Sequence, residues 1–261
     1  MKKVGIIGAG KIGGSLLLRL TESGGFDLGV SDIHPEQLRH FEEAGVCTTS
    51  SNRELAESSD LVIVAVKPWD VTQVMEEISP SFEDTNKAVT SVAAGVSIAR
   101  ISESLPEGTA VLRVMPNVCA SVGLGSAVVT ANEAGRAALP TVMDIFRHVG
   151  DVLELPERLF DAATALHGSG PAYVALFADA LIQAGVREGI PRDVARRLVI
   201  GTIGGTAVLL KERSAHQVRD EVMTPGGTTA AAFVAMEKAG FVAAVYDGVE
   251  AATEKARGLG G

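Results

Sequence analysis

Short β-rich runs alternate with helical segments through the first 154 residues of the chain and then stop. Several of these runs are unbroken in Val and Ile, which is typical of strands that are covered on both faces. Alternation of this kind predicts an α/β fold built on a mostly parallel sheet. The expected strands are 3–8, 27–31, 61–66, 88–92, 110–114, 127–130 and 152–155, and the expected helices are 12–23, 35–44, 70–78, 98–105 and 133–149.

Beyond Pro156 the β-rich runs are absent from the sequence, and the remaining 100 or so residues have an all-helical pattern. The expected helices are 158–189, 192–213, 216–223 and 229–258, with breaks at Gly-Ile-Pro and at Thr-Pro-Gly-Gly. We therefore expect two domains, 1–156 and 157–261. Because the second domain is small and rich in Gly and Ala, we expect it to complete its core by dimerising.

Composition excludes several classes of function. The 261 residues carry a net charge of −9, which disfavours a broad nucleic-acid surface. No apolar run approaches the ~18 residues of a membrane span. The two cysteines, Cys47 and Cys119, make no disulfide framework, and neither they nor the histidines have metal-ligand spacing, so no metal is expected. The sequence predicts a cytoplasmic protein.

A G-x-G-x-x-G motif follows the first expected strand and opens the first expected helix. This context, inside a βαβ unit, is typical of a dinucleotide site. The first glycine makes the tight turn, the second lets the pyrophosphate approach the backbone, and the third packs the helix on the sheet. The motif residues are Gly8, Ala9, Gly10, Lys11, Ile12 and Gly13.

Asp32 ends the second expected strand, 19 residues after Gly13. An acidic residue there is the usual partner of a ribose 2′-hydroxyl, which favours NADH over NADPH. A 2′-phosphate would be repelled, and the nearby His34 is a weaker phosphate partner than an arginine. The alternative is that Asp32 is only a turn residue before His34 and Pro35.

Three further segments end strands at positions where ligands bind in open α/β sheets. They are 65–68 (Ala-Val-Lys-Pro), 91–95 (Ser-Val-Ala-Ala-Gly) and 115–117 (Met-Pro-Asn). We expect all three to surround the nicotinamide end of one cleft, which makes Met115 and Asn117 candidate cofactor contacts. Strand-end turns without function are the alternative.

Two longer motifs lie in the second half, Gly-Ser-Gly-Pro-Ala-Tyr at 168–173 and Thr-Pro-Gly-Gly-Thr-Thr at 224–229. With these, the sequence resembles the pyrroline-5-carboxylate reductase family from residue 3 to the C-terminal helix. The resemblance implies an N-terminal Rossmann-type domain and an all-α dimerisation domain, with a homodimer that often assembles into larger rings. It also implies reduction of L-1-pyrroline-5-carboxylate to L-proline with NADH or NADPH, the last step of proline biosynthesis.

The resemblance assigns the substrate site to the second motif. Backbone N–H groups of Gly226, Gly227 and Thr228, next to a helix start, can form an anion-binding nest for the substrate carboxylate. Thr224 adds a hydroxyl. Thr229 matches the family residue that contacts the ring nitrogen, where it would donate a hydrogen bond or a proton while nicotinamide delivers hydride to the imine carbon.

Other positions also match the family. Glu212 matches a contact to product, and Glu221 occupies a position near the cofactor that is often Asn. Solvated helix charges are the alternative for both. The positions that match nucleotide contacts are Asn52, Val66, Lys67, Ala93 and Ala94.

The chain also departs from the family pattern. His167 stands where the family commonly has Ser, either as a titratable neighbour of the site or as a packing residue. Asp32 replaces the Asn or Ser that often accompanies NADPH use. Two other functions stay open at this point: a sister imine or 2-hydroxyacid reductase, and a nucleotide-binding regulatory protein. The intact 224–229 segment disfavours the second.

Overall fold

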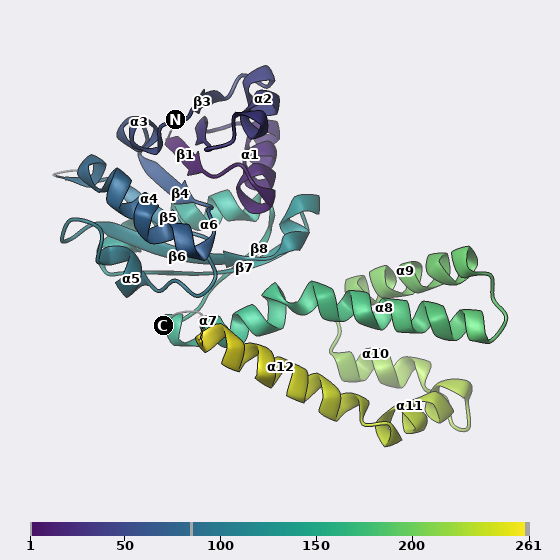
Figure 1. Cartoon of the computed structure of the whole chain (residues 1–261). Coiled ribbons are helices and arrows are strands. Elements are labelled where there is room, and N and C mark those ends of the chain that lie inside the picture. The colour runs from purple at the N-terminus through teal and green to yellow at the C-terminus, as the bar shows by residue number, and fades with distance from the viewer. Residues whose placement is uncertain (1, 84–85, 259–261) are drawn as a thin grey trace. The chain divides into compact units, whose positions relative to one another are not determined.

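The computed structural model describes residues 2–83 and 86–258. The chain forms two compact units, one of residues 1–169 with 252–261 and one of residues 170–251 (Figure 1). The first unit is a mostly parallel α/β structure and the second is all helical. The predicted fold class is therefore confirmed.

The first unit contains an eight-stranded sheet in the order β3-β2-β1-β4-β5-β6-β7-β8. All neighbouring strands pair in parallel except β6 and β7, which are antiparallel. The strands are β1 (Lys3–Ile7), β2 (Asp27–Ser31), β3 (Cys47–Thr49), β4 (Leu61–Val64), β5 (Ala88–Ser91), β6 (Ala110–Pro116), β7 (Gly125–Ala131) and β8 (Gly150–Glu154).

Helices cover both faces of this sheet (Figure 1). One face packs on α1 (Lys11–Ser23), α2 (Pro35–Glu43) and α6 (Leu139–Arg147), and its core includes the fully buried Leu17 and Phe146. The other packs on α3 (Asn52–Ser58), α4 (Val71–Ile78) and α5 (Ile98–Ser102), around Met75 and Ile78. Burial on both faces explains why β1, β4 and β5 have almost continuous apolar sequences.

Three predictions for the first unit were incomplete. β3 and α3 were not predicted, because β3 has only three residues and α3 is polar on its outer side. The expected helix 133–149 is a short 3-10 turn (Ala134–Ala137) followed by α6. Pro140 lies in the first turn of α6, where its missing N–H is tolerated, so the helix begins afresh there.

The first unit extends beyond the predicted domain end at residue 156. Residues 157–169 form a 3-10 turn, the short α7 (Phe160–Ala163) and a π-helical turn (Thr164–Gly168), in place of the start of one long helix. Phe160 is fully buried, and the guanidinium of Arg113 on β6 lies 4.7 Å from the centre of its ring. These contacts fix the segment to the sheet, which is why the compact unit ends at Ser169.

The second unit is formed by α8 (Gly170–Arg187), α9 (Arg192–Leu209), α10 (Ala215–Val222), α11 (Thr228–Lys238) and most of α12 (Phe241–Arg257). The single helix predicted over 229–258 is wrong, because Gly240 between α11 and α12 adopts φ +78° and ends the first of them. No single helix in the described part of the chain is long and apolar enough to cross a membrane. Taken together, α11 and α12 reach the length and apolar composition of a membrane span, but they are bent by 51° relative to each other.

Large apolar side chains of the second unit are exposed in the isolated chain. Leu176 is 72% exposed, Val208 63% and Tyr246 70%, whereas the buried side chains of residues 170–251 are only Ala178 and Ala195. A unit without its own core needs a partner surface to be stable.

We therefore expect dimerisation to be obligate, because a second copy of the chain would bury these side chains. Sedimentation equilibrium at low micromolar concentration should give a species of two chains, and the unfolding temperature should rise with protein concentration. A folded, active monomer under these conditions would contradict the prediction.

Candidate active site

Each glycine of the G-x-G-x-x-G motif has its own local environment. Gly8 adopts φ +98°, and a Cβ there would lie 2.7 Å from the carbonyl oxygen of Ala65. A Cβ on Gly13 would lie 2.0 Å from the Gly8 oxygen, so the backbone of α1 is in direct contact there with the backbone that follows β1. A Cβ on Gly10 would have no neighbour within 4 Å. The open side of the motif is therefore at Gly10.

The N-terminus of α1 opens at the same place. Gly10 is its N-cap residue, no side chain caps it, and its first turn holds no acidic residue. The first N–H groups of a helix have no partner within the helix and carry partial positive charge. The residues present thus fit a pyrophosphate, which would take its hydrogen bonds from these N–H groups.

Asp32 lies at the carboxyl end of β2 and contacts the motif directly. Its Oδ2 accepts a hydrogen bond from the backbone N–H of Ala9 at 2.7 Å, and its Oδ1 accepts one from the N–H of His34 at 2.8 Å. Asp32 therefore stabilises the turn before His34 and also joins the end of β2 to the glycine motif. Each carboxylate oxygen keeps a free lone pair, so the side chain can still accept from a ribose hydroxyl.

A cavity of about 170 Å³ adjoins Gly8 and Asp32. Within it, Ser31 Oγ donates to Asn52 Oδ1 at 2.8 Å, and Asn52 Nδ2 donates to Glu77 Oε2 at 2.8 Å. The cavity combines this polar network with apolar side chains, which suits the adenosine half of a dinucleotide. Its lining comprises Ile7, Gly8, Ser31, Asp32, Ile33, Asn52, Val66, Asp70, Gln73, Val74 and Glu77.

Several lining residues were not predicted from the sequence. Asp70, Gln73, Val74 and Glu77 lie at i, i+3, i+4 and i+7 around α4, so one face of this helix forms a wall of the cavity. That spacing is visible in the sequence, but the direction of the face depends on how α4 packs. Ile33, which is 78% exposed, lies directly after Asp32 and had no sequence signal.

The three strand-end segments lie at one edge of the sheet. They follow or end β4, β5 and β6, which are neighbours and parallel, so their carboxyl ends meet there. Val66 is half-buried and Lys67 exposed after β4, while Ala93 is buried and Ala94 half-buried after β5.

Met115 and Asn117 close β6 at this edge. Asn117 is buried, and its Oδ1 accepts from the N–H groups of Cys119 and Ser126, both at 3.2 Å. Its Nδ2 donates to the carbonyl oxygen of His167 at 3.1 Å. Asn117 therefore shapes the end of β6, with one amide hydrogen left for a ligand.

The Thr224–Thr229 motif forms a tight turn in front of α11 in the second unit. The N–H of Gly227 donates to the Thr224 oxygen at 3.0 Å, and Gly226 adopts φ +68°. Gly227 is the N-cap residue, and a Cβ there would lie 2.4 Å from Thr224 Oγ1. The first turn of α11, with Thr228 and the half-buried Thr229, thus presents backbone N–H groups without a capping side chain.

Glu212 and Glu221, the two glutamates that match family positions, make no hydrogen bond to the 224–229 turn within the described chain. Glu212 is exposed after α9. Glu221 forms an ion pair with Arg213 at 2.7 Å. No three His, Cys, Asp or Glu side chains of residues 2–83 and 86–258 are arranged to hold a metal ion.

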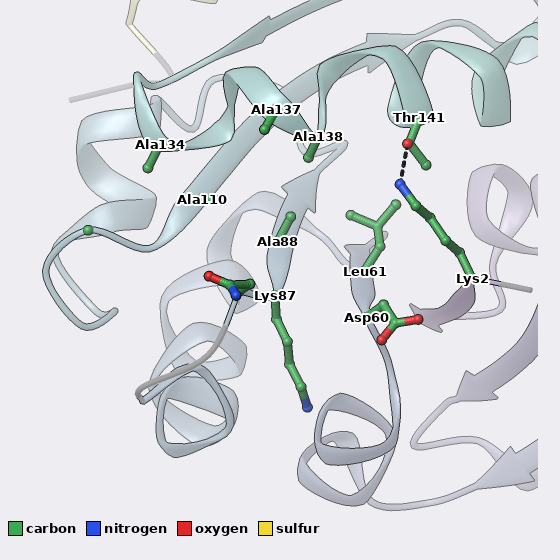
Figure 2. A pocket seen from close by; sticks show the side chains of 12 residues that line it. Lys2, Asp60, Leu61, Lys87, Ala88, Ala110, Ala134, Ala137, Ala138 and Thr141 are labelled. Carbon is green, nitrogen blue, oxygen red and sulfur yellow. Dashed lines mark hydrogen bonds between the residues drawn. The ribbon is translucent and has the colours of Figure 1, made fainter.

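A larger hollow of about 480 Å³ lies at the opposite edge of the sheet (Figure 2). It is lined by residues at the amino ends of strands, among them Asp60 and Ala88, and Lys2 Nζ donates to Thr141 Oγ1 at 2.5 Å across it. Ligands of open parallel sheets bind beyond the carboxyl ends of strands. Its position therefore separates this hollow from the candidate site.

Comparison with known proteins agrees with both halves of the chain. Residues 157–259 match the family model for pyrroline-5-carboxylate reductase dimerisation, and residues 3–95 match the model for NADP oxidoreductases that are coenzyme F420-dependent. A pyrroline-5-carboxylate reductase of Synechocystis is 37% identical over 265 residues, which cover 99% of this chain and 98% of the relative.

Two solved structures extend the agreement to three dimensions. A pyrroline-5-carboxylate reductase from Coxiella burnetii superposes with a TM-score of 0.94 at 32% identity, covering 100% of this chain and 99% of that one. A pyrroline carboxylate reductase from Plasmodium falciparum with NADP bound gives 0.88 at 32% identity, covering 100% and 98%. The chain therefore belongs to the pyrroline-5-carboxylate reductase family.

Proposed function

We propose that this protein reduces L-1-pyrroline-5-carboxylate to L-proline with NAD(P)H, as the last step of proline biosynthesis. The observation that carries the proposal is the full-length match to named reductases, with the dinucleotide motif and the 224–229 turn both intact. The family match disfavours a 2-hydroxyacid reductase, and the intact turn disfavours a regulatory protein without activity.

Residues of the first unit bind and orient the cofactor in this proposal. Gly10 and the N-terminus of α1 hold the pyrophosphate, and Asp32 accepts a hydrogen bond from the adenosine ribose. When bound, the nicotinamide supplies a hydride to the imine carbon. The strand ends that carry Ala93 and Met115 limit where the nicotinamide can lie, which aligns it for transfer.

Residues of the 224–229 turn bind the substrate. The N–H groups of Gly226, Thr228 and Thr229 bind its carboxylate without an arginine, while the N–H of Gly227 closes the turn on the Thr224 oxygen. The Thr229 hydroxyl donates a hydrogen bond to the ring nitrogen. As hydride adds to the imine carbon, the C=N π electrons become a lone pair on nitrogen. This nitrogen takes one proton from the Thr229 hydroxyl, which water reprotonates, and a second proton from water to become the ammonium group of proline.

A steady-state assay with pyrroline-5-carboxylate and either cofactor, followed by nicotinamide absorbance, tests the proposal. We expect stoichiometric oxidation of the cofactor and formation of proline. Absence of turnover with both cofactors by a correctly folded dimer would overturn it.

We also propose a preference for NADH. The adenosine cavity is lined by three carboxylates, Asp32, Asp70 and Glu77, and none of its lining residues is Lys or Arg. A 2′-phosphate carries about two negative charges, so these three carboxylates would repel it from the cavity. The same wall leaves the 2′-hydroxyl of NADH free to donate to Asp32.

The variant Glu77→Gln should reduce this preference, since it removes one charge and keeps an acceptor for Asn52. One repulsion of about 1 kcal/mol corresponds to roughly fivefold in the ratio of kcat/KM for NADH to that for NADPH. Dissociation constants for the two cofactors, measured without substrate, should move in the same sense. A wild-type protein with the higher kcat/KM for NADPH would contradict the preference.

We also propose that the protein forms a homodimer that builds a larger ring, as the family resemblance supports. We propose further that it acts in the cytoplasm, without membrane or nucleic acid as partners. Light scattering at high protein concentration should give a mass of several dimers, and cell fractionation should recover the protein with the cytosol. A mass of one dimer at all concentrations would exclude the ring.

A further inference from the structure

His167 is held by hydrogen bonds at both of its ring nitrogens. Its Nε2 lies 2.8 Å from the carbonyl oxygen of Met115, at the end of β6. Its Nδ1 lies 2.5 Å from the carbonyl oxygen of Ala163, in α7. Its own carbonyl accepts from Asn117 Nδ2 at 3.1 Å. Three bonds therefore connect this one residue to the strand end and to the preceding helix.

Both ring partners are carbonyl oxygens, which only accept. A neutral imidazole has one N–H, so one of its nitrogens would direct a lone pair at an oxygen lone pair. An imidazolium has two N–H groups and satisfies both oxygens at once. We propose that His167 is a positioning residue for the nicotinamide end of the site, and that it acts as an imidazolium donating to Met115 and Ala163.

The local backbone is built to bring His167 to β6. Residues 164–168 form a π-helical turn, closed by the N–H of Ser169 donating to the Thr164 oxygen at 3.0 Å. Such turns are frequent at functional sites. Gly168 follows with little room to spare, since a Cβ there would lie 3.2 Å from Met115 Cε. A side chain at 168 would therefore push on the end of the Met115 side chain.

A second anchor holds the same segment further from the strand end. Arg113 Nη1 donates to Glu157 Oε1 at 3.0 Å, and this oxygen also accepts from the N–H of Ile98 at 2.8 Å. Arg113 also stacks on Phe160. Because this anchor fixes the start of the segment, loss of the His167 bonds would free mainly the end of β6 with Met115.

The charged groups of the packed elements do not account for a proton on His167. On β6 the charged side chain is Arg113, which is directed at Glu157 and Phe160. On α7 it is Asp161. Within the described chain no carboxylate lies at ion-pair distance from the His167 ring. The two carbonyl oxygens are therefore the groups that hold the second proton.

Nitrogen-15 NMR of the apo dimer tests the charge state without any catalysis. The chain has five histidines, and the His167 signals are those that disappear in His167→Gln. At pH 7 both ring nitrogens should show the shifts of protonated nitrogens. One protonated and one unprotonated nitrogen, the signature of a neutral tautomer, would overturn the charged form.

The kinetic test rests on the proposed reaction. His167→Gln should lower kcat up to about 100-fold, because displacement of a reactant by about 1 Å has costs of that order. The dissociation constant of NADH should stay within about twofold of wild type, since the adenosine cavity is untouched. It can be followed through quenching of Trp69, the single tryptophan. The exposed His40 gives a matched control, His40→Gln, with wild-type kinetics.

The split between kcat and KM separates positioning from a purely structural role. His167→Gln should lower kcat and leave the KM for pyrroline-5-carboxylate near the wild-type value, because the 224–229 turn is untouched. An unchanged kcat in His167→Gln, or a loss that falls on KM alone, would overturn the inference. A wild-type protein without pyrroline-5-carboxylate reduction would instead overturn the proposed function and leave the NMR result to stand.

Discussion

Gly13→Ala should abolish cofactor binding and lower the free energy of unfolding by about 3 kcal/mol or more. The new Cβ would lie 2.0 Å from the carbonyl oxygen of Gly8, a backbone atom that moves only if β1 or α1 moves. Overpacking in a rigid core typically costs about 1–3 kcal/mol, and a backbone clash lies at the upper end. Urea unfolding at fixed protein concentration and quenching of Trp69 by NADH are the measurements.

Gly10→Ala is the matched control three residues earlier. Gly10 has φ −69°, which alanine adopts without strain, and its Cβ would meet no atom within 4 Å. The variant should unfold at the wild-type urea concentration. Its affinity for NADH should fall all the same, because the methyl group would occupy the side proposed to bind the pyrophosphate. Equal stability of the two variants, or full NADH affinity in Gly10→Ala, would refute the assigned roles.

The sheet was predictable because its strands are buried on both faces. Continuous apolar runs marked β1, β4 and β5, and their order along the chain follows the usual parallel winding. β3 was missed because three residues, Cys47–Thr49, carry too little pattern. α3 was missed despite a readable start signal: Ser51 Oγ accepts from the N–H of Glu54, three residues on.

The site was less predictable, because its walls come from tertiary packing. The glycine motif and Asp32 belong to one known sequence pattern, and the structure joins them through the Ala9–Asp32 hydrogen bond. Glu77 has no local signal that directs it at Asn52, 25 residues earlier. The bond between His167 and Met115 spans 52 residues, and no sequence period relates the two.

The break at Gly240 shows a different limit of sequence analysis. A glycine inside a helical pattern is often tolerated at a cost of about 1 kcal/mol, so the pattern alone favoured one continuous helix. The left-handed φ of +78° at Gly240 ends α11 and starts α12 in a new direction. α11 is thereby a separate short helix whose N-terminus meets the 224–229 turn.

Thr229→Val should lower kcat/KM for pyrroline-5-carboxylate roughly 10- to 150-fold. The substitution removes the hydroxyl donor and keeps the β-branched shape. A hydrogen bond to a charged group is worth about 1.5–3 kcal/mol, and each 1.36 kcal/mol corresponds to about tenfold in rate. The affinity for NADH should barely change, because the dinucleotide motif lies in the other unit.

Stability should also change little in Thr229→Val. The N-cap of α11 is Gly227, and the Thr229 hydroxyl makes no hydrogen bond to another described residue. Thr229→Ser, which keeps the donor, should retain most of the activity and so separates the hydroxyl from the methyl group. Unaltered kcat/KM in Thr229→Val would show that another group serves the ring nitrogen. Loss of the fold in Thr229→Val, with Thr229→Ser intact, would instead make the Thr229 hydroxyl a structural element of the turn.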